Sequence, residues 1–211
     1  FSHVGQKEIL STAFSHDGRQ VFSSGSDKKL SLWNTKGDYV MGSDNTNHSD
    51  WVSKIRYSPS QKNKFYASVG WDGELKIWTD FFRQAATVKA HDGPIYALAI
   101  NGQGNFIATG GKDKTVKLWK VGETDKALKE FKCDSNITDL AFHPEMKWLA
   151  VATENSVKFY ELYKDSTQAD ASVEAIQINK KCPIKPKFTS VAWSAKGKAL
   201  YAGATDGLIR V

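Results

Sequence analysis

The sequence is poor in the residues that build disulfide frameworks, metal centres and membrane spans. It has two cysteines and five prolines in 211 residues, and no window approaches 18 consecutive apolar residues. Cys133 and Cys182 form no Cys-x-x-Cys pattern, so we expect no disulfide framework, no metal, no cofactor and a reduced, intracellular setting. The missing apolar run excludes a transmembrane helix, and the first residues, FSHVGQKEIL, show no signal peptide.

The positive charge of the sequence is not organised into a nucleic-acid motif. A formal net charge of +6 permits an anionic partner such as RNA. No arginine-rich block or RNA-recognition signature accompanies that charge, which favours a lysine-decorated soluble surface. One lysine-rich segment contains Lys180, Lys181, Lys185 and Lys187. It is either a contact for RNA or an acidic protein, or a solvated loop.

One strand pattern recurs five times and organises the chain. The copies end at Phe14, Tyr57, Ile100, Phe142 and Trp193, with spacings of 43, 43, 42 and 51 residues. Each copy is followed by a turn, a short apolar strand, an acidic turn and an alternating strand, as in GWDGELKIW at 70–78. Period-two alternation between turns is typical of antiparallel strands. About four strands in each period of roughly 40–45 residues indicate propeller blades.

The chain is therefore predicted to be all-β, with only a weak helical periodicity in DASVEAIQI at 170–178. Rings of this kind usually hold about seven blades, so we expect a propeller portion with about four complete blades and partial ends. The first residues resemble the last strand of a preceding blade, and the remaining blades are expected outside this sequence. The single propeller portion, 1–211, is divided into repeats at 5–47, 48–90, 91–132, 133–183 and 184–211, the last incomplete.

Serine, histidine and aspartate residues near GWDGELKIW raise the possibility of a hydrolase. A catalytic triad is expected once, whereas this set recurs in the next repeat at nearly the same spacing. Repetition indicates an internal hydrogen-bond network that holds a turn, and we expect no catalysis. The two tetrads and one incomplete set are His48, Ser68, Asp72 and Trp78; His91, Thr109, Asp113 and Trp119; and Ser23, Asp27 and Trp33. The fourth and fifth repeats lack the histidine, so their turns should be weaker or held in another way.

The residue before each turn acid is expected to project at one rim of the propeller. These residues are Ser26, Trp71, Lys112, Thr153 and Thr205, with Trp51 and Pro94 nearby at the starts of strands. Trp71, Trp51 and Lys112 together form a candidate hot spot for a partner. The alternatives are that Trp51 packs beneath its own loop and that Trp71 only shields the turn.

SGSDKKLSLWNT, GWDGELKIW and GGKDKTVKLW together resemble the WD-repeat family, and the resemblance runs along the whole chain. HSDWVSKIRYSP, SVKFYEL and TSVAWSAKGKALYAGATDGLIRV are further similar to one branch of it, the G-protein-β-like scaffolds of the small ribosomal subunit. The long connection from Tyr163 to Lys187 is also similar to a loop of that branch. The chain departs from the pattern in Tyr160, where tryptophan is usual, and in the missing Gly-His before Ile9.

The resemblance implies a non-enzymatic, cytoplasmic platform on the small ribosomal subunit that docks signalling kinases such as protein kinase C. It also implies kinase-docking segments at 135–142 and 156–162, of which only edges and loops should be accessible. RNA-contacting residues of that branch lie mainly in the first blades, outside this sequence. A G-protein β-type or other signalling adaptor away from the ribosome is the alternative. A hydrolase or metal enzyme would instead need a unique polar cluster facing the central channel.

Overall fold

The computed structural model is built from antiparallel strands. It describes residues 8–43, 48–79, 82–146, 148–162, 172–177 and 186–211. These residues form four sheets of four strands and one sheet of three, which confirms the expected all-β propeller architecture. Within them, no helix has the length and apolar character needed to cross a membrane.

Each sheet uses strands in their sequence order. The first contains β1 (Ile9–Phe14), β2 (Gln20–Gly25), β3 (Leu30–Asn34) and β4 (Tyr39–Gly42). The second contains β5 (Val52–Tyr57), β6 (Tyr66–Gly70), β7 (Glu74–Thr79) and β8 (Arg83–Lys89). The third contains β9 (Ile95–Ile100), β10 (Phe106–Gly111), β11 (Thr115–Lys120) and β12 (Lys129–Lys132). The fourth contains β13 (Ile137–Phe142), β14 (Trp148–Thr153), β15 (Ser156–Glu161) and β16 (Ser172–Gln177). The fifth contains β17 (Phe188–Trp193), β18 (Leu200–Ala204) and β19 (Ile209–Arg210).

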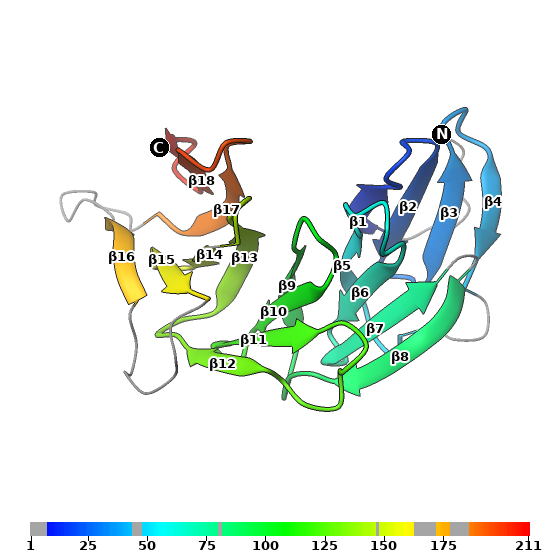
Figure 1. Cartoon of the computed structure of the whole chain (residues 1–211), viewed down its shortest axis with the longest axis horizontal. Helices are drawn as coiled ribbons and strands as arrows, with labels where there is room; N and C mark the ends of the chain where they lie inside the picture. Colours follow the sequence, from blue (N-terminus) through cyan, green and yellow to red (C-terminus); the bar gives the residue numbers. More distant parts are fainter. Residues whose placement is uncertain (1–7, 44–47, 80–81, 147, 163–171, 178–185) are drawn as a thin grey trace.

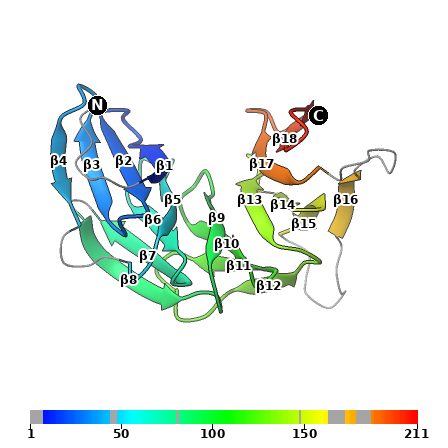
Figure 2. The same ribbon diagram turned by 180° about the vertical axis from the view of Figure 1, so that it is seen from behind.

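The sheets follow one another along an open arc, with the first sheet at one tip and the last sheet at the other (Figures 1 and 2). The first strand of each sheet contacts the first strand of the next, so β1, β5, β9, β13 and β17 line the inside of the arc. The last strands, β4, β8, β12 and β16, lie on its outside (Figure 1). This radial order is the arrangement of propeller blades.

Burial along the strands follows from this stacking. All five residues of the middle strand β6 are buried, whereas none of the seven residues of the outer strand β8 is. Each hydrophobic cluster joins two neighbouring sheets; one of them, for example, packs Phe22 and Leu32 of the first sheet against Ile55 and Trp78 of the second. A sheet of this size has two apolar faces, so it depends on its neighbours to cover them.

Side-chain hydrogen bonds tie neighbouring sheets together along the inner strands. The hydroxyl of Ser11 in β1 accepts the backbone N–H of Ile55 in β5 over 3.3 Å. Asp139 in β13 plays the same part for Val191 in β17, over 3.0 Å. Both acceptors occupy the third position of the repeated strand pattern, so two of the repeats use the same position for a contact between sheets.

The segment with weak helical periodicity is a strand. Ser172–Gln177 forms β16 and pairs with β15 at the outer edge of the fourth sheet. The pairing partner decides the conformation here, because a short segment with ambiguous spacing adopts the strand form when a sheet edge is available.

Candidate functional site

The turn between β6 and β7 holds the first complete polar set. His48 Nδ1 lies 2.8 Å from Asp72 Oδ2, and His48 Nε2 lies 2.8 Å from Ser68 Oγ. The indole N–H of Trp78 donates to the same serine oxygen over 2.9 Å. Ser68 and Trp78 are fully buried and His48 is 2% exposed. A substrate cannot reach the serine hydroxyl, so this geometry does not support hydrolysis.

The turn between β10 and β11 repeats the arrangement. His91 Nδ1 lies 2.8 Å from Asp113 Oδ2, and His91 Nε2 lies 2.8 Å from Thr109 Oγ1. Trp119 donates its indole N–H to Thr109 over 2.9 Å. A neutral imidazole satisfies every contact: its Nδ1–H donates to the carboxylate, and its Nε2 accepts the threonine hydroxyl. The network therefore joins the connection between β8 and β9, through Thr109 in β10, to Trp119 in β11.

The first sheet forms only part of this network. Trp33 donates its indole N–H to Ser23 Oγ over 2.8 Å, as in the complete sets. Asp27 accepts the backbone N–H of Lys29 over 3.1 Å. No histidine bridges Ser23 and Asp27 among the residues that the structure describes.

The corresponding turns of the fourth and fifth sheets are held by other contacts. In the fourth, Thr153 Oγ1 accepts the backbone N–H of Ser156 and donates to the Ser156 carbonyl, over 3.1 and 3.0 Å. In the fifth, Asp206 forms an ion pair with Arg210 at 2.5 Å. Tyr160, which stands where tryptophan is usual, lies with its hydroxyl 3.2 Å from Cys133 Sγ.

The contacts within the polar sets shift the pKa values of their aspartate and histidine residues. Burial raises the pKa of Asp72, but the hydrogen bond and Coulombic attraction of His48 outweigh burial and hold that pKa below its usual range. The pKa of Asp113 is lowered in the same way, against burial, by His91 and the backbone N–H of Thr115. Burial lowers the pKa of His91 despite the neighbouring carboxylate, which agrees with a neutral ring.

These shifts predict that acid destabilises the fold in two stages. The unfolded chain binds a proton on His91 at higher pH than the folded chain, so stability should fall as pH drops below about 6.5. The lowered pKa values of Asp72 and Asp113 add a second loss below about pH 4. Urea denaturation, followed by tryptophan fluorescence at several pH values, measures both stages. His91→Gln should show a shallower first stage, and identical pH profiles for the two proteins would contradict this assignment.

One cluster has the composition of a metal site. His48, Asp72 and Glu74 bring ligand atoms within 4.8 Å of one another. Both ring nitrogens of His48 already contact Asp72 and Ser68, and Glu74 pairs with Lys76 at 3.1 Å. These groups use their ligand atoms on one another, so the arrangement favours a structural network over an ion.

The rim beside these turns carries an aromatic cluster. The rings of Trp51 and Trp71 lie 4.6 Å apart, and the backbone N–H of Trp71 donates to the Trp51 carbonyl over 2.8 Å. Tyr96, at the start of β9, meets Trp71 edge to face at 6.3 Å. Trp71 is 37% exposed. We call Trp51, Trp71 and Tyr96 the aromatic rim patch.

Tyr96 was missed by the sequence reasoning. It occupies the second position of the repeated strand pattern, where the other repeats have Leu10, Ser53, Thr138 and Thr189. An aromatic residue at this position in only one repeat is the feature of the sequence that indicates it. Burial and the negative charge of Glu154 raise the pKa of Tyr96, so the patch adjoins an acidic group.

Two of the expected rim residues do not project. Thr153 is 1% exposed because its hydroxyl closes its own turn, and Ser26 is 7% exposed because its hydroxyl contacts the backbone of Glu8. The expectation that they lie at the surface is therefore wrong. Lys112 and Thr205 are exposed, as expected, and the Lys112 backbone N–H donates to the Pro94 carbonyl.

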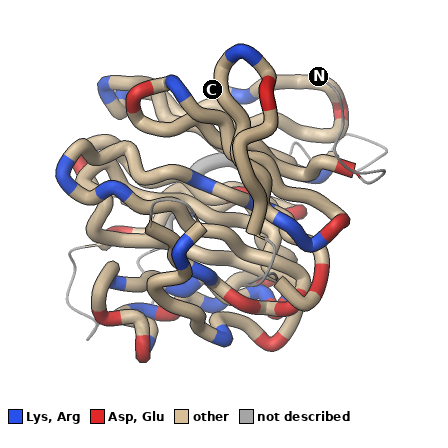
Figure 3. Tube along the Cα trace, turned by 90° about the vertical axis from the view of Figure 1, so that its right-hand side faces the viewer, with Lys and Arg blue, Asp and Glu red and all other residues tan. Residues whose placement is uncertain are grey.

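The lysine-rich segment lies mostly outside the described residues, which include Lys187 but not Lys180, Lys181 or Lys185. Lys187 forms an ion pair with Glu154 at 3.2 Å, and its backbone N–H donates to Thr205 Oγ1 over 2.9 Å. Basic and acidic residues are interspersed along the trace of the described chain (Figure 3). No residue of 135–142 or 156–162 is fully exposed.

The chain matches the family model of the WD domain, G-beta repeat, at residues 1–34, 37–79, 82–120 and 125–161. The second of these segments begins just before β4 and ends with β7, so a sequence repeat supplies the outer strand of one sheet and three strands of the next. This offset interlocks neighbouring sheets.

Curated relatives include proteins from fungi and a plant. The chain is 38% identical over 178 residues to the small ribosomal subunit protein RACK1 of Neurospora crassa, covering 84% of this chain and 56% of that protein. It is 37% identical to MST50-interacting protein 11 of Pyricularia oryzae, with the same coverage. It is 38% identical to the small ribosomal subunit protein RACK1y of Oryza sativa, covering 84% of this chain and 54% of that protein. The chain thus spans about half the length of these relatives.

Proposed function

The chain belongs to the WD-repeat family, and from this we propose that it is part of a non-enzymatic scaffold that associates with the small ribosomal subunit in the cytoplasm. Two relatives are named as small ribosomal subunit proteins and a third as an interacting protein. The scaffold type is that of the receptor for activated C kinase, and its partners include signalling kinases such as protein kinase C. The five repeats at 5–47, 48–90, 91–132, 133–183 and 184–211 are proposed as its building units.

The aromatic rim patch is the observation that carries the docking role. Aromatic side chains that lie exposed and pre-packed bind partners at low entropic cost, because few rotamers are lost on association. Trp71 packs against Trp51 and meets Tyr96 edge to face, while more than a third of its surface stays exposed. The repeated polar sets, in contrast, are buried and serve the turns. Lys112 and Thr205 extend the exposed rim as polar surroundings of the patch.

Sucrose-gradient sedimentation of the full-length protein tests the association with ribosomes. We expect the protein to migrate with small subunits at low salt and to be released by salt washes, because contacts to RNA weaken as salt rises. Migration only at the top of the gradient at low salt would contradict the proposal. That outcome would favour a G-protein β-type or other signalling adaptor that acts away from the ribosome.

Trp71→Ala tests the docking role of the rim. We expect about a tenfold loss of affinity for purified, activated protein kinase C, measured by biolayer interferometry, because the substitution removes the exposed centre of the patch. Cosedimentation with small subunits should stay unchanged. Tyr201→Ala is the matched control, since Tyr201 is an exposed aromatic residue at 43% on another sheet. Equal affinities of the Trp71 variant and the unchanged protein would contradict the docking role.

A further inference from the structure

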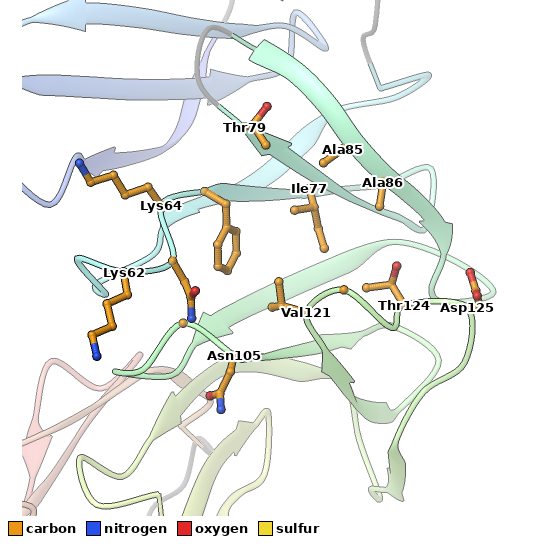
Figure 4. A pocket seen from close by; sticks show the side chains of 14 residues that line it. Lys62, Lys64, Ile77, Thr79, Ala85, Ala86, Asn105, Val121, Thr124 and Asp125 are labelled. Atoms are coloured by element: carbon orange, nitrogen blue, oxygen red, sulfur yellow. The ribbon is translucent and has the colours of Figure 1, made fainter.

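A groove opens between the second and third sheets (Figure 4). It lies at the opposite end of the strands from the aromatic rim patch, because its lining includes the loop before β6, whereas Trp71 follows β6. Its volume is about 640 Å³, within the range of pockets that accept a ligand or several side chains. Its walls come from the loop before β6, the ends of β7 and β8, and the loops at 104–105 and 121–125. Each of these segments lies far from the repeated turns that hold the polar sets.

The floor of the groove is apolar. Phe65 and Ile77 are 6% and 5% exposed and belong to the core between the two sheets. Val121 and Ala86 pack against that core and remain partly exposed at the groove. Ile77 and Val121 lie in the middle of the groove (Figure 4). The groove therefore offers a place for one apolar side chain whose burial would continue the existing core.

Side chains of opposite charge lie at the two ends of the groove. Lys62 and Lys64 lie at one end, and Thr124 and Asp125 lie at the other (Figure 4). Both lysines and Asp125 are exposed, and none of the three has an ion-pair partner among the described residues. Thr124 is 8% exposed and lies beside Asp125 in the groove lining. The charged groups at both ends are thus available to a ligand.

We propose that this groove docks an extended segment of a partner protein with an ordered charge pattern. An acidic residue of that segment pairs with Lys62 and Lys64, and an apolar side chain enters between Ile77 and Val121. A basic residue or backbone N–H groups follow at Asp125 and Thr124. The charge order favours protein over nucleic acid, because a phosphate backbone would place negative charge along the whole groove, including beside Asp125.

Fluorescence anisotropy with a designed peptide tests the proposal. The probe is fluorescein-labelled Glu-Glu-Gly-Leu-Gly-Lys-Lys, and its partner probe has the glutamates and lysines exchanged. We expect saturable binding of one charge order, with a Kd below about 1 mM, and at least tenfold weaker binding of the other. Replacing the leucine by glycine should abolish saturation. Equal binding of both charge orders, or no saturable binding of either, would overturn the proposal.

Charge reversal at the lysine end gives a matched comparison. Lys62→Glu with Lys64→Glu should weaken the preferred peptide at least tenfold. The control is Lys196→Glu with Lys198→Glu, an exposed pair with the same spacing in the equivalent turn before β18. Ala86→Phe should also weaken binding by filling the groove without a change of charge. Equal loss in the control pair, or tighter binding of a single-stranded oligonucleotide than of the peptide, would overturn the assignment.

Discussion

Replacing Asp72 with alanine is expected to lower the free energy of unfolding by about 3 kcal/mol. The carboxylate accepts His48 Nδ1–H and the backbone N–H groups of Ser49 and Glu74, over 2.8, 2.9 and 3.0 Å. The His48 side chain is 0% exposed, so water cannot replace the lost acceptor without opening the turn. Each buried polar group left unpaired costs about 1–3 kcal/mol.

Asp27→Ala is the control that separates the contribution of the histidine link from that of the turn acid alone. Asp27 stands at the same position of the first repeat and accepts the backbone N–H of Lys29, but no described histidine joins it. We expect its loss to cost less than about 1 kcal/mol. Urea denaturation followed by tryptophan fluorescence measures both variants, and equal costs would show that the histidine link contributes nothing. A double-mutant cycle with His48→Ala isolates the coupling between the two side chains.

The Asp72 substitution also bears on the proposed partner site. Trp71 is the residue immediately before Asp72, and its backbone N–H is fixed on the Trp51 carbonyl. Loosening this turn should therefore weaken kinase binding even though Asp72 itself is nearly buried. The buried polar set thus positions the exposed aromatic ring.

Gly73→Ala is expected to cost about 3 kcal/mol, because it combines two penalties. Gly73 has φ +73°, a left-handed conformation that disfavours a Cβ. An added Cβ would collide with the backbone carbonyl oxygen of His91 and lie 3.0 Å from the Gly93 carbonyl oxygen. The Gly73 carbonyl also accepts the backbone N–H groups of Ala90 and His91. A shift of that loop would therefore disturb the histidine of the next polar set.

Gly207→Ala separates the two penalties. Gly207 follows the turn acid of its repeat in the same way and has φ +77°, but an added Cβ would meet nothing within 4 Å. We expect a cost of about 1 kcal/mol, from the backbone conformation alone. Lys28 and Lys114 adopt φ values of 68° and 62° at the equivalent positions, so the conformation itself is tolerated. Thermal or urea denaturation of both variants tests the difference, and equal costs would contradict the role of the His91 contact.

The sequence by itself determined the repeat, the strand class and the composition of the polar sets. These features are local. Alternation sets the strand, the residues around the acid set the turn, and the interval of six residues fixes where the aromatic residue lies along the strand after the turn, as in Asp72 and Trp78. The structure then brings His48, from the connection before β5, against Ser68 in β6, as the spacing in two consecutive repeats predicts.

The tertiary structure alone decided which rim residues are exposed to solvent and which side chains lie between neighbouring sheets. Thr153 and Trp71 hold equivalent positions in their repeats, yet one is buried against its own turn and the other stacks on Trp51. Tyr96 joins the rim, and the groove at Ile77 and Val121 forms, only when neighbouring sheets pack together. The physical reason is that a repeat specifies contacts within and beside its own sheet, whereas exposure depends on side chains brought by the next sheet along the arc.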